Sequence, residues 1–130
     1  CAAVADYRPA TVAEQKIKKE ANGEESQLAL VKNPDILKTI AVSAQPPFCI
    51  GFAAETENVK AHALDKLKRK QLKLIVANNV SDSRIGFNSN DNAVTVYWQN
   101  GEQDFAPQSK ALLASELNQL FAQHYFELRG

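Results

Sequence analysis

Two nearly continuous apolar runs, at residues 48–54 and 72–77, flank a segment at residues 56–71 whose apolar side chains recur at helical spacing. Strands buried on both faces of a parallel sheet have such continuous runs, whereas strands with one exposed face alternate. The pattern therefore predicts a strand, a crossover helix and a second, parallel strand. Ligands of open α/β sheets bind beyond the carboxyl ends of such strands, so residues 52–56 and 78–82 are the places to search for a site.

The crossover helix is predicted to have two different faces. Its polar face carries His62, Lys66 and Lys70, and like charges four residues apart repel by roughly 0.2–0.5 kcal/mol. A bound phosphate would more than offset that repulsion, because opposite charges about 4 Å apart near a surface attract by about 4 kcal/mol before desolvation. An ordinary solvated basic face fits the same pattern, and the residues leave both alternatives open. The apolar face is expected to bury Val59, Ala63, Leu64 and Leu67.

The amino-terminal segment is predicted to contain a strand and a loop. Residues 1–5 read as a short apolar strand that delivers Asp6 at its end, either as a ligand contact or as a turn residue. Residues 10–27 are rich in charge and lack an apolar face, which predicts a mobile surface loop. Lys16 begins a lysine cluster in that loop, and both solvation and phosphate binding fit it.

A further helix is predicted after an alternating strand at residues 27–32. Asn33 is expected to be its N-cap, Pro34 its first helical residue, and Asp35 a complement to the helix dipole. The exposed amides of such a helix start also suit an anionic ligand. The buried stripe of this helix is expected to consist of Ile36, Leu37 and Ile40.

The carboxyl-terminal part is expected to form a loop, a hairpin and a last helix. Residues 81–92 are rich in Ser, Asp and Asn, which predicts a loop. Residues 94–98 are β-branched and aromatic, and the Asn-Gly pair at 100–101 is a strong hairpin turn before a second strand at 103–106. Ser109 is expected to cap a helix that covers the sheet. One face of that helix carries Leu113, Leu117, Leu120, Phe121 and His124.

The composition is that of one ordinary globular domain, with 130 residues of which 45% are hydrophobic. Fifteen basic and fifteen acidic side chains cancel, so no overall field favours nucleic acid or an anionic membrane. No apolar run approaches the roughly 20 residues that span a membrane, and the cytoplasm is the default location.

Cys1 and Cys49 are expected to be reduced, buried small side chains. Because the chain contains no Met, we expect it to begin within a domain and further sequence to precede Cys1.

Several kinds of catalytic motif are absent from the sequence. It contains no HExxH, no CxxC pair, no GxSxG, no P-loop and no GxGxxG motif. A dedicated transition-metal site and a protein nucleophile are therefore not expected. Lysines near strand ends remain, and they suit binding of a phosphorylated small molecule and stabilisation of charge as phosphate leaves.

A set of short motifs occurs in one order along the chain: AAVADYRP, KIKK, NPDIL, GFAAET, the spacing of Ala63, Lys66 and Lys70, IVANNV and IGFNSNDNAVTV. Over nearly the whole chain they resemble the carboxyl half of bacterial phosphopantothenate-cysteine ligase, also called phosphopantothenoylcysteine synthetase. The resemblance implies a Rossmann-like α/β fold with a mostly parallel sheet, flanking helices and a carboxyl-terminal β-hairpin, here truncated at the amino terminus. Residues 1–130 would form a single domain, the carboxyl-terminal part of a CTP-binding ligase domain.

The resemblance also implies an activity. The family uses CTP and magnesium to join 4'-phosphopantothenate to cysteine through an acyl-cytidylate, a step of coenzyme A biosynthesis. Its members act as homodimers and are usually fused behind a decarboxylase that binds FMN. The family's glycine-rich phosphate loop and catalytic Asn would lie in an upstream half of the domain, before Cys1. The alternatives from other classes are a Rossmann-like nucleotide-binding module without ligase chemistry and a purely structural or interaction domain.

The resemblance further implies residue roles. Lys16 becomes the catalytic lysine of the mobile loop, closing over the reacting phosphate and carboxylate. Lys66 and Lys70 would hold the triphosphate, and Phe52 would pack on the nucleotide. Asn79 departs from the family, which commonly has Asp there, and the position is left without an assigned role. The full set of implied nucleotide contacts is Cys1, Ala2, Asp6, Lys16, Pro34, Asp35, Ile36, Leu37, Phe52, Lys66 and Lys70.

Overall fold

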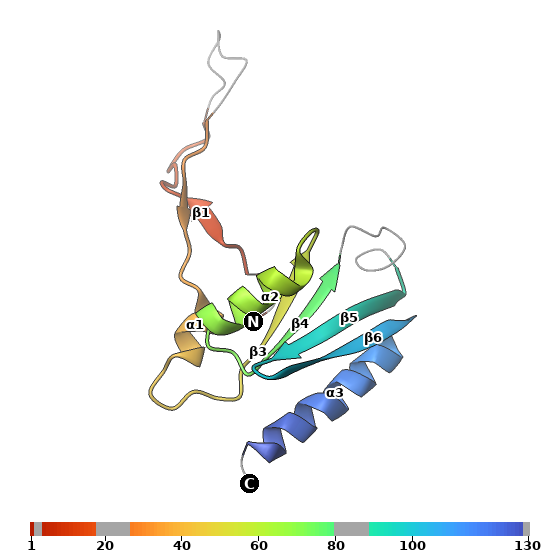
Figure 1. Cartoon of the computed structure of the whole chain (residues 1–130). Coiled ribbons are helices and arrows are strands. Elements are labelled where there is room, and N and C mark those ends of the chain that lie inside the picture. The colour runs from red at the N-terminus through yellow and green to blue at the C-terminus, as the bar shows by residue number, and fades with distance from the viewer. Residues whose placement is uncertain (2–3, 18–26, 80–88, 129–130) are drawn as a thin grey trace.

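The computed structural model of the chain describes residues 1, 4–17, 27–79 and 89–128 (Figure 1). The predicted loop at 81–92 falls largely outside these ranges, as do Ala2 and the middle of the predicted mobile loop. The elements follow one another in the order β1 (Tyr7–Pro9), β2 (Leu30–Lys32), α1 (Ile36–Ala41), β3 (Ile50–Glu55), α2 (Val59–Arg69), β4 (Leu74–Asn79), β5 (Asp91–Trp98), β6 (Gly101–Ser109) and α3 (Lys110–Glu127).

The predicted crossover is confirmed. Strands β3 and β4 are parallel neighbours, paired from Ile50 opposite Leu74 to Glu55 opposite Asn79, and α2 connects them. The helix begins at residue 59 rather than 56 because β3 continues to Glu55 and the chain then turns. Asn58 completes that turn in the left-handed region, with a φ of 47°.

The four-stranded sheet has the order β3-β4-β5-β6 and is mixed. The pair β3/β4 is parallel, whereas β4/β5 and β5/β6 are antiparallel. The Rossmann-like α/β class with flanking helices and a carboxyl-terminal hairpin is confirmed. The share of parallel pairing is smaller than expected, because β5 runs back along β4 and the hairpin adds a second antiparallel pair.

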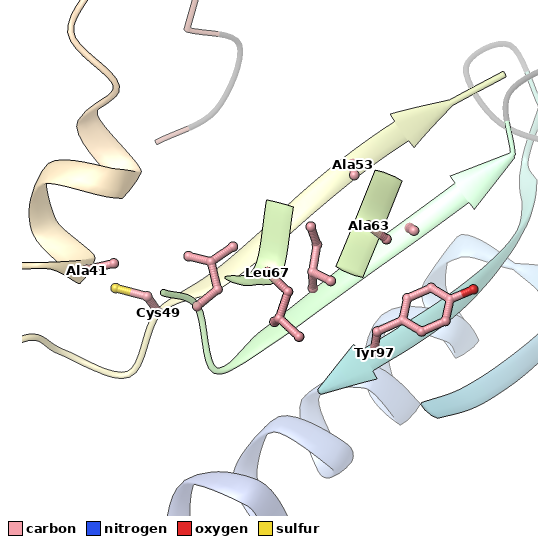
Figure 2. Close-up of a cluster of buried hydrophobic side chains, with 9 residues drawn as sticks. Ala41, Cys49, Ala53, Ala63, Leu67 and Tyr97 are labelled. Carbon is pink, nitrogen blue, oxygen red and sulfur yellow. The ribbon is translucent and has the colours of Figure 1, made fainter. Parts of the chain in front are cut away.

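Two apolar clusters fill the space on the two faces of the sheet. Ile75 and Ala77 of β4 pack on the α2 side, whereas Leu74 and Val76 pack on the α3 side. This alternation explains the continuous apolar run of β4, because a strand covered on both faces has no solvent-facing position. Figure 2 shows the α2-side cluster between α2 and the sheet, extending from Ala41 of α1 to Tyr97 of β5.

The apolar face of α2 was predicted in part. Ala63 and Leu67 are buried and Val59 is partly buried against the same cluster. Leu64 is exposed, so its expected burial is wrong. Its position one residue after Ala63 turns it away from the centre of the apolar stripe, which Ala63 and Leu67 occupy.

The amino-terminal part differs most from the expectation. Residues 1, 4 and 5 are not part of a strand, and residues 2–3 lie outside the described ranges. Strand β1 begins at Tyr7 and pairs with β2 in a separate antiparallel ribbon that extends away from the main sheet (Figure 1). Cys1 and Val4 are exposed, so the expected burial of Cys1 is wrong, whereas Cys49 is a buried free thiol as predicted. All residues of β1 and β2 are exposed, because the ribbon has no layer packed on it in the described part of the chain.

Helix α1 starts later than predicted. Its N-cap is Asp35, whose carboxylate accepts a hydrogen bond from the backbone N–H of Lys38 at 3.0 Å. Asn33 cannot serve as the cap because its side chain is engaged elsewhere, donating to the backbone oxygen of Ala5 at 2.8 Å and accepting from Arg8 at 3.0 Å. Pro34 therefore precedes the cap instead of occupying the first helical position.

The predicted apolar stripe of α1 is also only partly correct. Ile36 and Ile40 are exposed, whereas Leu37 packs against the α2-side cluster. The helix has only six residues, from Ile36 to Ala41, and it meets the sheet near its carboxyl end, where Ala41 is buried. The other apolar positions consequently lack a covering layer in the described part of the chain.

The carboxyl-terminal hairpin and helix agree with the sequence. Strands β5 and β6 pair across the turn at residues 99–100, and β6 continues past the predicted end, through Pro107, beside a register shift between Asn92 and Val94. The hydroxyl of Ser109 caps α3 by accepting a hydrogen bond from the N–H of Leu112 at 3.3 Å. Among the helices in the described ranges, none is both long and apolar enough to cross a membrane. The buried face of α3 consists of Leu113, Leu117 and Leu120.

Candidate functional site

Two lysines four residues apart, Lys66 of α2 and Lys70 at its C-cap, form the centre of the candidate site. The Nζ of Lys66 lies 2.5 Å from Oε1 of Glu55, at the end of β3. The Nζ of Lys70 lies 2.9 Å from Oδ2 of Asp35, at the start of α1. The pairs bring three separate elements together, and we call these four residues with His62 the lysine–carboxylate cluster.

Glu55 is the most enclosed member of the cluster, with 13% of its side chain exposed. Its second carboxylate oxygen, Oε2, lies 3.3 Å from Nδ1 of His62. The hydrogen bond from Lys66 is the main cause that holds the pKa of Glu55 below its ordinary value, and the charge of Lys66 and the contact with His62 act in the same direction. Glu55 is therefore a carboxylate kept ionised between two donors from one helix.

Asp35 combines a structural contact with an electrostatic one. The backbone N–H of Lys38 is the first cause that lowers the pKa of Asp35, and the hydrogen bond from Lys70 is the second. A carboxylate that caps a helix and also accepts from an ammonium group has its charge balanced from both sides. This ion pair links the start of α1 to the end of α2.

Both lysines of the cluster are partly accessible to an anionic ligand. Lys66 and Lys70 keep 35% and 23% of their side chains exposed, so both ammonium groups are partly accessible from solvent. An ammonium group carries three donors, and a phosphate oxygen can be accepted alongside the carboxylate or in its place. Lys66 therefore offers a partly accessible ammonium group at the carboxyl end of β3, and Lys70 offers a second one at the start of α1, and both suit an anionic ligand.

The four residues predicted to contact the nucleotide at the helix start, residues 34–37, differ in their relation to this cluster. Asp35 belongs to it, Pro34 and Ile36 are exposed beside it, and Leu37 turns toward the apolar core. Phe52 is 72% exposed, and strand alternation places it on the face of β3 opposite Glu55. The structure thus separates Phe52 from the two lysines.

Three of the predicted nucleotide contacts belong to the described amino-terminal residues. Cys1, Asp6 and Lys16 are exposed. The backbone oxygen of Asp6 accepts a hydrogen bond from the N–H of Asn33 at 2.8 Å, which ties the entry of β1 to the exit of β2. No ion pair or hydrogen bond between described residues joins these three side chains to the cluster, and their roles remain predictions, as does that of Ala2.

Sequence reasoning missed Glu55. The available signal was its position in the GFAAET segment, at the carboxyl end of a buried strand and directly before a helix with lysines on one face. His62 was placed on the correct helix face but was not assigned to the site. Among the residues that the structure describes, no three or more His, Cys, Asp or Glu side chains are grouped in a way that could hold a metal ion.

The family model and the curated relatives that match this chain name related proteins of pantothenate metabolism and coenzyme A biosynthesis. The family model described as the DNA/pantothenate metabolism flavoprotein C-terminal domain matches residues 1–125. The Coenzyme A biosynthesis bifunctional protein CoaBC of Vibrio vulnificus strain CMCP6 is 52% identical over 118 residues, which are 90% of this chain and 29% of that protein. The CoaBC protein of Escherichia coli K12 is 50% identical over 119 residues, again 90% of this chain and 29% of the relative. The chain thus spans less than a third of the length of these curated relatives.

Two solved structures have the same architecture. The crystal structure of the C-terminal domain of Coenzyme A biosynthesis bifunctional protein CoaBC superposes with a TM-score of 0.66 at 34% identity, covering 94% of this chain and 51% of that one. The DNA/pantothenate metabolism flavoprotein from Streptococcus pneumoniae gives a TM-score of 0.67 at 22% identity, covering 94% of this chain and 57% of that one. The second likeness concerns the fold alone.

Proposed function

Because the chain belongs to the family of the DNA/pantothenate metabolism flavoprotein C-terminal domain, we propose that it is the carboxyl-terminal part of a phosphopantothenate-cysteine ligase of coenzyme A biosynthesis. The protein that carries it would join 4'-phosphopantothenate to cysteine at the expense of CTP. The observation that carries this proposal is the lysine–carboxylate cluster, which lies within the matched residues and offers two partly exposed ammonium groups, one at the end of β3 and one at the start of α1. Relatives about half identical to this chain are named for coenzyme A biosynthesis.

The proposed reaction has two steps. A carboxylate oxygen of 4'-phosphopantothenate attacks the α-phosphorus of CTP, and the bond to the β-phosphate breaks as pyrophosphate leaves with its electron pair. The amine of cysteine then attacks the acyl carbon, loses a proton, and expels CMP. Neither step requires a protein nucleophile, so the tasks of the protein are positioning and stabilisation of charge.

Residue roles follow from the same proposal. Lys66 and Lys70 hold the outer phosphates of CTP, and Lys16 closes over the reacting phosphate and carboxylate. Phe52 and the residues around the start of α1 contact the nucleotide from other sides, which is compatible with their exposure. The remaining proposed nucleotide contacts are Cys1, Ala2, Asp6, Pro34, Asp35, Ile36 and Leu37.

Magnesium would bind at this site together with the triphosphate of CTP. The described residues offer no cage of three ligands, and the two carboxylates of the cluster are each engaged by a lysine. Magnesium typically binds through one or two carboxylates together with substrate phosphates. With both carboxylates of the cluster paired to lysines, the ion would be held chiefly by the substrate phosphates, whose charge it would neutralise when bound.

The wider assembly belongs to the proposal as well. The protein would act as a homodimer in the cytoplasm, completed by an upstream half of the same domain. Any FMN would belong to a fused decarboxylase and not to these residues.

The test of the ligase proposal uses the protein that carries this chain. Release of CMP and pyrophosphate is measured with CTP, 4'-phosphopantothenate and cysteine, and then with each substrate omitted. We expect pyrophosphate release to require 4'-phosphopantothenate and CMP release to require cysteine as well. Thermal unfolding with CTP, ATP or NAD provides a second measurement, because a ligand at a hundred times its Kd adds roughly 2.7 kcal/mol of stability. A preference for NAD, or nucleotide binding without pyrophosphate release, would point to a nucleotide-binding module instead.

A further inference from the structure

Glu55 contacts two other side chains of the cluster, one through each carboxylate oxygen. It is the last residue of β3 and pairs with Asn79 at the end of β4, so its backbone position is fixed by the parallel ladder. From there its two carboxylate oxygens contact two side chains one turn apart on α2, Lys66 at 2.5 Å and His62 at 3.3 Å. A rigid strand end therefore sets the direction of two flexible side chains on a neighbouring helix.

We propose that Glu55 is a positioning residue that holds Lys66, with His62 beside it, at the carboxyl end of β3 in readiness for the triphosphate. The inference rests on the proposed function, because it assigns Lys66 to the phosphates of CTP. It adds a residue that touches neither the nucleotide nor the reacting atoms. Glu55 acts through the lysine.

The physical reason is preorganisation. A free lysine side chain has four rotatable bonds, and ordering it when a ligand binds opposes binding. The enclosed carboxylate of Glu55 holds the Nζ of Lys66 in place already in the folded protein. The conformational entropy of the lysine is therefore lost during folding and not when the nucleotide binds. The same carboxylate also repels phosphate, but its charge is balanced by that of Lys66, so we expect the ordering effect to exceed the repulsion.

A purely structural role for Glu55 predicts a different behaviour. If the contact with Lys66 only attached α2 to β3, its loss would lower the thermal unfolding temperature and leave nucleotide selectivity unchanged. A positioning role instead affects ligands that reach Lys66. CTP should be affected more than CMP, because Lys66 is assigned to the outer phosphates that CMP lacks.

The experiment compares Glu55→Gln, Glu55→Asp and Lys66→Met with the double variant Glu55→Gln/Lys66→Met in the protein that carries this chain. Gln keeps the size of the side chain but removes its charge, whereas Asp keeps the charge but withdraws it by one methylene. Asp65→Asn is the matched control, because it removes one negative charge from α2 at a 71% exposed side chain that contacts Arg69 and not Lys66. Calorimetric titration gives the Kd for CTP and CMP, and thermal unfolding checks the fold.

For Glu55→Gln we expect the Kd for CTP to rise about tenfold, which is about 1.4 kcal/mol, and the Kd for CMP to change by less than about twofold. Glu55→Asp should change in the same direction by a smaller factor, and Asp65→Asn should resemble the wild type. In the Lys66→Met background the additional effect of Glu55→Gln should vanish, because the side chain through which it acts is gone.

The contrary outcomes are equally clear. Unchanged or tighter CTP binding in Glu55→Gln overturns the positioning role, as does a full additional loss in the Lys66→Met background. Failure of both Glu55 variants to fold would assign the residue to the structure and would also overturn it. If the wild type binds no CTP, the proposed function falls together with this inference, which distinguishes that result from a defect confined to the Glu55 variants.

Discussion

Replacing Lys70 by Met separates the phosphate-binding role of this lysine from its role in joining α1 to α2. In the structure its ammonium group lies 2.9 Å from Oδ2 of Asp35, in a pair whose side chains are 23% and 36% exposed. Partly exposed ion pairs contribute about 0.2–1 kcal/mol to stability, so unfolding should change only slightly. A charge-assisted hydrogen bond to a phosphate is worth about 1.5–3 kcal/mol, so its loss should lower the CTP affinity by roughly 10- to 150-fold.

The assay is calorimetric titration of Lys70→Met with CTP and with CMP at low ionic strength. The Kd for CMP should change much less, because CMP lacks the outer phosphates. Lys68→Met on the same helix is the control, and it should bind both nucleotides nearly as the wild type does. Equal losses for CTP and CMP in Lys70→Met would refute the assignment of this lysine to the outer phosphates.

A second variant shows how much of the loss comes from the carboxylate left behind. Asp35→Asn keeps the helix cap, because Asn caps as well as Asp, and removes the charge that Lys70 balances. Combined with Lys70→Met, it should recover part of the CTP affinity, since an unpaired carboxylate no longer repels the phosphates. If the double variant binds CTP no better than Lys70→Met, repulsion by Asp35 plays no part.

Three further predictions concern catalysis, pH and the core. Lys16→Gln should slow formation of the acyl-cytidylate in rapid-quench experiments without shifting thermal unfolding, and unchanged single-turnover rates would remove Lys16 from the reaction. The pKa values of Asp35 and Glu55 are lowered below their ordinary 3.8 and 4.5, so the stability that they contribute is present above those values and is lost as the pH falls through the folded pKa values. Urea unfolding from about pH 6 to about pH 3 should therefore show a smaller acid-induced loss in Glu55→Gln than in the wild type, and equal losses would contradict the pairing. Val96→Ala should lower the free energy of unfolding by about 1.5–3 kcal/mol because Val96 is 0% exposed in the α3-side cluster, whereas Val12→Ala at an 88% exposed position should change it by less than about 0.5 kcal/mol.

The crossover could be predicted because its sequence pattern has one physical cause. Strand β4 is covered by α2 on one face and by α3 on the other, so every position from Leu74 to Ala77 is apolar. The hairpin and the Ser109 cap are equally local, since turn and cap chemistry depend on neighbouring residues. These parts of the fold are encoded within a few residues of where they form.

The errors have a common cause in contacts between distant residues. Asn33 and Asp35 are both good N-cap residues, and only the hydrogen bonds of Asn33 to Ala5 and Arg8 decide between them. The ribbon of β1 and β2 could not be predicted because pairing of residues across a long loop leaves no periodic trace in either strand. The exposure of Ile36 likewise depends on what packs against α1.

The candidate site was predicted in the same uneven way. The spacing of Lys66 and Lys70 showed that two positive charges lie one turn apart on one helix. It could not show that each has a carboxylate partner, because Glu55 and Asp35 come from other elements and meet the lysines only after folding. The resemblance supplied the expected chemistry of the ligand, whereas the contacts identified Glu55 as the partner of Lys66.

The proline in β6 affects how the protein can self-associate. Strands β3 and β6 are the outer strands of the sheet in the described part of the chain, and the outer strand of a sheet is a template on which further strands can add. Pro107 has no amide hydrogen, and the register shift opposite it distorts the ladder, so β6 is a poor template for fibrillar aggregation. Strand β3 has no proline among its six residues. Of the two outer strands in the described part of the chain, β3 is therefore the better template for edge-to-edge pairing.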